Sequence, residues 1–317
     1  MNRSKLLRSV LAIVLALSVV VSFAACSKNG GEEGGTTNAV NQAAPSDAAK
    51  PPVQTFDALL TTVFESSDLK VDVTNPDGEK SDFSGSFGNN LSDSNIEIEI
   101  SEEMKIIIAG TKVTLSTPEG EQSLDIQTFI GVADLDSVLK EFGIDEPVVD
   151  VADGVINNGK IERSAIAYLY DEKLRPVLED MLKAELDVEV ELPTFEDTIG
   201  YIREFLNSGI SKEALNFTVV EETNGTVTYN VTFNAAKLVE DFGDHVMKHT
   251  ELLAIAKAFA GEEEGAVEEM FAAFVEEASV IPGGSLQVTI SGGRLTKVVC
   301  APAGGDTYTF AITSSKK

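Results

Sequence analysis

The only two histidines of the chain, His245 and His249, stand four residues apart, and Asp241 precedes the first of them by the same spacing. If this segment forms one helix, side chains four residues apart share a face, so the three would lie in a row. Imidazole and carboxylate groups bind divalent metals such as zinc, so Asp241, His245 and His249 form a candidate metal site. The pattern lacks the glutamate of the His-Glu-x-x-His motif, and a catalytic zinc centre is therefore not expected. The alternative is a polar helix face that carries both imidazoles without a metal.

Cys26 follows a segment with a basic start, an apolar run from Val10 to Val21 and the small residues Ala24 and Ala25. These features are typical of an export signal, and the run is short for a membrane span. With its terminal cysteine the segment resembles the lipobox of bacterial lipoproteins, although Phe23 stands where that family usually has leucine. The alternatives are an N-terminal core helix and an uncleaved membrane anchor.

The lipobox resemblance implies that residues 1–25 are removed and that Cys26 becomes a lipidated N-terminus. Its thiol would then carry a diacylglyceryl group. The two acyl chains of this group suit stable anchoring, since one chain alone holds a protein at a membrane only marginally. The expected location is the cell membrane, with the folded part outside the cytoplasm.

Cys300 is the only other cysteine of the chain. It ends the predicted strand Leu295–Cys300, where it is expected to be a small buried side chain rather than a nucleophile, because unreactive cysteines are commonly buried. If Cys26 carries lipid, Cys300 is expected to have no partner within the chain.

The chain is strongly acidic, with 52 acidic and 24 basic residues and a formal net charge of −28. Removal of residues 1–25 takes away three basic and no acidic residues, which changes the net charge to −31. The electrostatic field of so negative a chain repels nucleic acid and attracts cations or basic proteins. The alternative is an acidic surface with no dedicated partner. The chain carries no nucleotide-binding, serine-nucleophile or paired-cysteine motif, so we expect neither enzyme activity nor a cofactor.

Residues 26–54 are rich in small and polar types, which predicts a flexible tether of roughly 30 Å. Residues 55–317 are predicted to form a single extracytoplasmic domain that starts with a helix near 56–65. Alternating strands follow up to about residue 117, helices are predicted near 126–142, 161–186 and 195–206, and Pro176 predicts a kink or a break in the second of these. A hairpin centred on Asn224-Gly225, helices over about 236–260 and 264–280, and three final strands complete the pattern.

Nearly every predicted strand has one apolar and one polar face, and the helices carry apolar stripes. These patterns predict an α+β fold, in which a long curved antiparallel sheet packs its apolar face on a helical layer. Behind a lipobox, this element order resembles the superfamily of LolA-like lipoprotein and glycolipid carriers, which hold acyl chains between sheet and helices. The resemblance implies binding of a lipid or another hydrophobic ligand. The alternatives are a structural or protein-interaction module of the cell envelope, with a basic envelope protein as its partner, and a metal-binding lipoprotein.

Overall fold

The structure is a computed structural model that describes residues 50–74, 78, 80–101, 104–132, 134–141, 144–186, 189–261, 263–281, 283–302 and 307–315. The predicted signal peptide, Cys26 and the predicted tether up to residue 49 lie outside the described residues. The tether was predicted to end at residue 54, but helix α2 (Pro51–Phe64) begins at Pro51. Proline suits the first turn of a helix because it lacks an N–H that would have no partner there. Residues 51–54 therefore belong to the folded part.

The strands form an eleven-stranded sheet in the order β6-β5-β4-β3-β2-β1-β13-β12-β11-β10-β9 within the described ranges. Each strand lies beside its sequence neighbour except where β1 pairs antiparallel with β13. The result confirms the predicted α+β class and its long, open antiparallel sheet. The strands are β1 (Asp68–Thr74), β2 (Lys80–Ser86), β3 (Asn95–Ser101), β4 (Met104–Ala109), β5 (Lys112–Thr117), β6 (Gly120–Asp125), β9 (Leu215–Thr223), β10 (Thr226–Phe233), β11 (Gly284–Ser291), β12 (Arg294–Pro302) and β13 (Tyr308–Ser315).

The chain divides into two compact units that alternate along the sequence. Unit 1 includes residues 200–293 and 299–308, and unit 2 includes residues 58–199, 294–298 and 309–317. Each unit contributes strands to the sheet and has helices of its own, so each is described separately.

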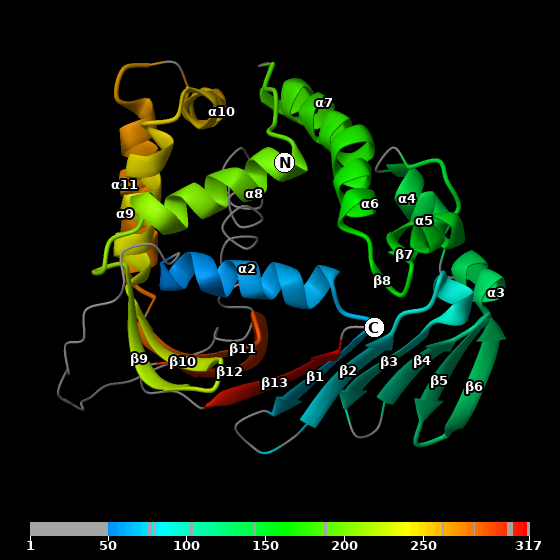
Figure 1. The fold of residues 1–317 in the computed structure, drawn as a ribbon. Coiled ribbons are helices and arrows are strands. Elements are labelled where there is room, and N and C mark those ends of the chain that lie inside the picture. The colour runs from blue at the N-terminus through cyan, green and yellow to red at the C-terminus, as the bar shows by residue number, and fades with distance from the viewer. Residues whose placement is uncertain are drawn as a thin grey trace. The chain divides into compact units, whose positions relative to one another are not determined.

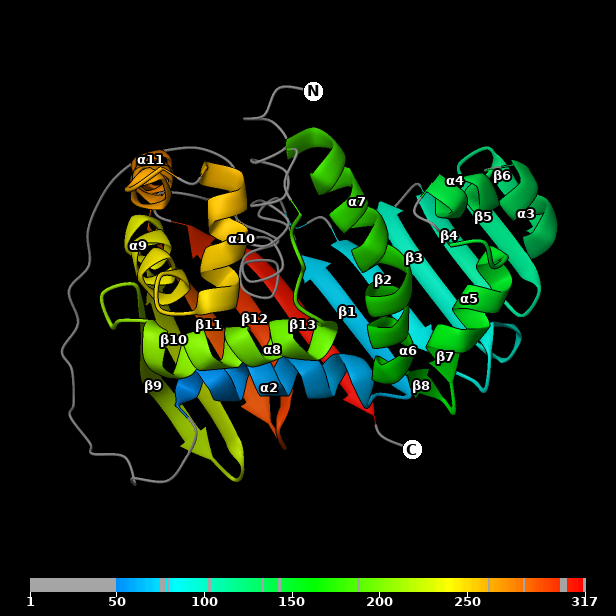
Figure 2. The same ribbon diagram turned by 90° about the horizontal axis from the view of Figure 1, so that it is seen from above.

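In unit 2, helices α3 to α7 all lie on one side of strands β1 to β6 (Figures 1 and 2). They are α3 (Ile126–Val132), α4 (Leu135–Glu141), α5 (Val148–Val155), α6 (Arg163–Tyr168) and α7 (Arg175–Leu186). A short hairpin, β7 (Ile156–Asn157) with β8 (Lys160–Ile161), follows α5, and the short helix η1 (Leu91–Asp93) connects β2 to β3. The core of this unit is a cluster of buried apolar side chains from strand ends, η1, α3 and β7: Phe87, Leu91, Val113, Ile126, Ile130 and Ile156.

In unit 1, helices α9 (Ala235–Val246), α10 (Thr250–Ala260) and α11 (Ala266–Ser279) pack on one another. Their shared apolar cluster consists of Val239, Val246, Ala256, Val267, Phe271 and Ala278. The predicted hairpin at Asn224-Gly225 is confirmed: it joins β9 to β10, and both turn residues have positive φ angles, 50° and 77°. This backbone is the one that a tight two-residue hairpin requires.

Two predicted helices are interrupted. The helix predicted over 126–142 is divided into α3 and α4 near Asp134, whose φ of 50° cannot continue a helix. The helix predicted over 161–186 contains the π-helical segment η2 (Leu169–Leu174), and Pro176 lies in the first turn of α7. Proline removes a backbone donor and crowds the preceding turn, and the helix widens just before it. The helical backbone continues through Pro176 without the alternative of a break, and the kink stays a prediction.

Candidate functional site

The apolar face of strands β3 to β6 is a candidate site in unit 2. The strand register places side chains in rows across the sheet, and one row consists of Ile96, Ile108, Val113 and Leu124. The adjacent row on the same face consists of Ile98, Ile106, Leu115 and Gln122. Side chains two residues apart on a strand share a face, so these two rows form one continuous surface that is apolar except for Gln122.

The helices cover only part of this surface. Val113 is 4% exposed, whereas Leu115, two residues further along β5 on the same face, is 38% exposed. Met104, at the start of β4, is 37% exposed and Leu124 on β6 is 41% exposed. The apolar face is therefore sealed at Val113 and accessible to solvent around Leu115, Met104 and Leu124.

The cover over the sealed part comes from α3, α5 and the β7–β8 hairpin. Phe129 of α3 packs against the buried cluster of unit 2, as do Val148, Val149 and Ala152 of α5 and Ile161 of β8. A backbone hydrogen bond from Gly159 N–H to the carbonyl of Gly88, 2.8 Å long, joins the β7–β8 turn to the segment after β2. The cover is thus fastened to the sheet at one end by both packing and hydrogen bonding.

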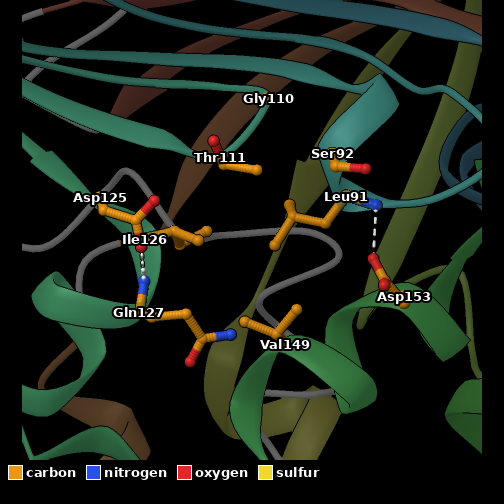
Figure 3. A pocket seen from close by; sticks show the side chains of 9 residues that line it. All are labelled: Leu91, Ser92, Gly110, Thr111, Asp125, Ile126, Gln127, Val149 and Asp153. Atoms are coloured by element: carbon orange, nitrogen blue, oxygen red, sulfur yellow. Dashed lines mark hydrogen bonds between the residues drawn. The ribbon is translucent and has the colours of Figure 1, made fainter.

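A small cavity lies at this sealed end, with a volume of about 110 Å³. Figure 3 shows apolar side chains of Leu91, Ile126 and Val149 lining it beside polar ones from the strand ends and α5. Its complete lining is Leu91, Ser92, Gly110, Thr111, Asp125, Ile126, Gln127, Val149 and Asp153. Sites for drug-sized ligands have volumes of roughly 300–1,000 Å³, so this cavity as it stands holds only a small fragment.

Two carboxylates fix the elements around the cavity (Figure 3). Asp153 Oδ1 on α5 accepts a hydrogen bond of 2.7 Å from the backbone N–H of Leu91. Asp125 Oδ1 accepts one of 3.0 Å from the N–H of Gln127, which satisfies a donor at the start of α3. Of these two contacts, the one made by Asp153 joins the cover to η1, the short helix between β2 and β3.

A second recess in unit 2, of about 200 Å³, lies on strands β13, β1, β2 and β3. Its lining is mostly polar: Asp68, Leu69, Lys70, Ser84, Gly85, Ser86, Asn95, Thr313 and Ser315. The Asp68 carboxylate accepts hydrogen bonds from the hydroxyls of Ser67, Ser86 and Ser315. These contacts pair the polar groups of neighbouring strands with one another and identify no ligand.

The predicted metal ligands Asp241, His245 and His249 belong to unit 1 and do not share one helix. Asp241 and His245 lie in α9, which ends at Val246, and His249 is the extended residue that precedes α10. The prediction of a single helix over 236–260 was therefore wrong. The N–H groups of Lys248 and His249 bond to carbonyls three residues back, a tighter turn that ends α9.

The structure brings the rings of His245 and His249 to within 4.3 Å of each other, whereas Asp241 contacts other groups. Asp241 accepts a 2.6 Å hydrogen bond from the backbone N–H of Ser211 and forms an ion pair of 3.2 Å with Lys237. His249 Nε2 lies 3.3 Å from Glu204 Oε1. Within the described ranges, no group of three or more histidine, cysteine, aspartate or glutamate side chains is placed to hold a metal ion. The structure does not assemble the predicted ligand set.

His245 is buried, with 3% of its surface exposed, and its ring lies 5.4 Å from that of Phe205 and 4.3 Å from that of His249. No hydrogen-bond partner for its Nε2 atom occurs among the residues described. Burial lowers the pKa of the His245 imidazole, and the charge of His249 adds to this effect while Glu204 opposes it. These contacts favour a neutral ring inside unit 1.

Cys300 lies in β12 and is 2% exposed, which confirms the prediction of a buried side chain. The expectation that Cys300 has no partner depends on lipidation of Cys26 and stays a prediction. Cys26, the predicted lipidation site, lies outside the described residues.

Sequence reasoning missed the cavity and its Asp153 contact. Asp125 could have been found, since an aspartate just before an apolar helical pattern is a signal for a helix start. Asp153 carried no such signal, because α5 itself was not predicted.

No protein-family model and no curated protein matches this chain. None of the helices in the described ranges has the length and apolar character needed to span a membrane.

Proposed function

We propose that this chain is a lipid-anchored extracytoplasmic protein that binds a hydrophobic ligand on the apolar face of β3 to β6. The ligand lies against the part of that face around Leu115, Ile106 and Met104, next to the cover formed by α3 and α5. The anchor is the lipidated Cys26, which holds the protein at the membrane from which such a ligand would come.

The observation that carries the proposal is the difference between Val113 and Leu115 on one strand face, 4% and 38% exposed. Covering an apolar sheet face stabilises a protein, because each Å² of apolar surface removed from water contributes about 25 cal/mol. A face that stays partly open beside a helical cover gives an acyl chain a surface to bury. Each CH₂ group that it buries there contributes about 0.8 kcal/mol to binding.

The cavity of about 110 Å³ at the sealed end does not hold a whole acyl chain. A longer ligand must therefore lie along the open part of the face, or the cover must move away from the sheet. Both alternatives place the ligand against the side chain of Leu115.

The test uses the full chain in membranes of the cells that express it, incubated with a photoreactive fatty acid that carries a diazirine. Peptide mapping after illumination should find the label on β4 and β5. The variant Leu115→Asp puts a charge on the apolar face, and a bound chain would have to desolvate it, so labelling should fall at least about tenfold.

The matched control is Ser116→Asp, which makes the same charge change at the next residue. Ser116 points to the opposite face of β5, where it stands across from Lys105, and this variant should keep the wild-type labelling. Label found only on the polar face or near Cys26, or equal labelling of the Leu115→Asp and Ser116→Asp variants, would rule out this binding surface.

A further inference from the structure

Strands β9 and β6 stand at the two ends of the strand order in the part of the chain that the structure describes. A strand at a sheet end has unpaired backbone groups along one side, and proteins usually protect such an edge with short strands, lysine or proline. β6 is short, and of its six residues only Leu124 is a large apolar one. β9 has nine residues and includes neither lysine nor proline.

Two of the exposed residues of β9 are apolar. Val219 and Val220 are 52% and 56% exposed, although they stand side by side in the middle of the strand. The register with β10 pairs Val219 with Tyr229 and Glu221 with Thr228, and it skips Val220. Val220 is therefore a β-bulge residue. Bulges in edge strands usually hinder pairing with another strand, but this one exposes two valine side chains that a partner could cover.

Acidic residues follow directly. Glu221 and Glu222 are exposed near the end of β9, and neither β9 nor its neighbour β10 contains a basic residue. The only charges on these two strands are therefore negative, in a chain whose formal net charge is −28. A second copy of this chain would bring the same charges to the edge, whereas a basic segment would neutralise them.

We propose that the outer edge of β9 pairs with an extended basic segment of another protein, which adds a strand to the sheet. Backbone hydrogen bonds to β9 supply the pairing, apolar side chains of the partner cover Val219 and Val220, and lysine or arginine residues lie opposite Glu221 and Glu222. This mode of recognition uses an exposed sheet edge as a template. The surface is separate from the apolar face proposed to bind a hydrophobic ligand.

The test measures binding of a labelled synthetic peptide to the full chain in detergent by fluorescence anisotropy. The peptide alternates valine and threonine and ends in two lysines, and a second peptide has glutamates in their place. The full chain should bind only the lysine peptide. Replacing both Glu221 and Glu222 by lysine should weaken this binding about threefold to tenfold, and Val219→Lys should weaken it at least about tenfold.

The control variant is Glu121→Lys on β6, the other sheet edge, which should bind the lysine peptide as the wild type does. Hydrogen exchange should show new protection in β9 and none in β6 when the peptide is bound. Absent binding, or an equal loss in the Glu121→Lys variant, would overturn the proposal, because the attraction would then be absent or general to the acidic surface. Self-association that Val219→Lys abolishes and the lysine peptide does not reduce would assign the edge to a second copy instead.

Discussion

The hydrogen bond between Asp153 and Leu91 offers a direct test of how the cover is held on the sheet of unit 2. Asp153→Ala removes the acceptor of a 2.7 Å bond and leaves the N–H of Leu91, a residue only 7% exposed, without it. Hydrogen bonds to a charged group contribute about 1.5–3 kcal/mol, and a partly exposed carboxylate contributes less. We expect a loss of about 1–2 kcal/mol of local stability from this substitution.

Hydrogen exchange of the Leu91 amide measures this change, because the exchange rate reports local opening. A loss of about 1–2 kcal/mol accelerates exchange roughly fivefold to thirtyfold. Asp153→Asn keeps an acceptor oxygen and should show a smaller effect. Asp150→Ala, an exposed position on the same helix, should show none. Unchanged exchange at Leu91 in the Asp153→Ala variant, or equal acceleration by Asp150→Ala, would refute the assigned role of Asp153.

The Asp153→Ala variant also tests whether the cover must open before the ligand can bind. If entry of the ligand requires the cover to open, a larger open population raises apparent affinity in proportion. Labelling of Asp153→Ala by the photoreactive fatty acid should then increase by the factor found for Leu91 exchange. Labelling that stays constant while exchange accelerates would show that the ligand binds along the open part of the face without movement of the cover.

Three further predictions concern other parts of the chain. Thr62→Val should destabilise unit 2 by about 1–3 kcal/mol in urea unfolding, because the buried Leu295 N–H loses its 2.9 Å bond to the Thr62 hydroxyl, whereas Thr62→Ser should keep most of the stability. Because burial lowers the pKa of His245 in the folded state, the unfolded chain binds the proton first as the pH falls. Stability should therefore decrease below pH about 6.5 and level off below the folded pKa, and His245→Phe should reduce this slope in thermal unfolding between pH 7 and 5. Cys26→Ala should abolish membrane association and the mass of a diacylglyceryl group on the N-terminal peptide; recovery of Cys26 in a disulfide with Cys300 from the wild type would contradict lipidation.

The sequence predicted those features that depend on local backbone chemistry. The Asn224-Gly225 turn could be placed because its residues tolerate the positive φ angles that the hairpin needs, and the structure has them there. The end of α9 could not be placed in the same way. The residues that follow it, Met247, Lys248 and His249, include neither glycine nor proline, so the apolar periodicity continues across the break. The metal hypothesis depended on that continuity and lost its geometric basis with it.

The sequence could not predict the cavity at the sealed end, because its lining residues are far apart along the chain. Its lining comes from η1, the β4–β5 turn, the start of α3 and α5, and the Leu91 to Asp153 bond spans 62 residues. Alternating strand residues predict which face is apolar, but the location of the cover depends on where α3 and α5 pack. Val113 and Leu115 occupy equivalent places in the alternating pattern of β5, yet only one of them is covered.

Truncating the side chains of Val113 and Leu115 tests where on β5 the cover ends. Val113→Ala removes two carbons from a side chain 4% exposed, which costs about 2 kcal/mol when the lost transfer energy and the resulting cavity are combined. Leu115→Ala removes three carbons, but Leu115 is 38% exposed and no closed cavity forms, so the expected cost is about 1 kcal/mol. The smaller truncation should therefore lower the urea midpoint of the full chain more than the larger one. A greater loss for Leu115→Ala would mean that the face around Leu115 is packed in solution, and it would remove the surface on which the proposed ligand lies.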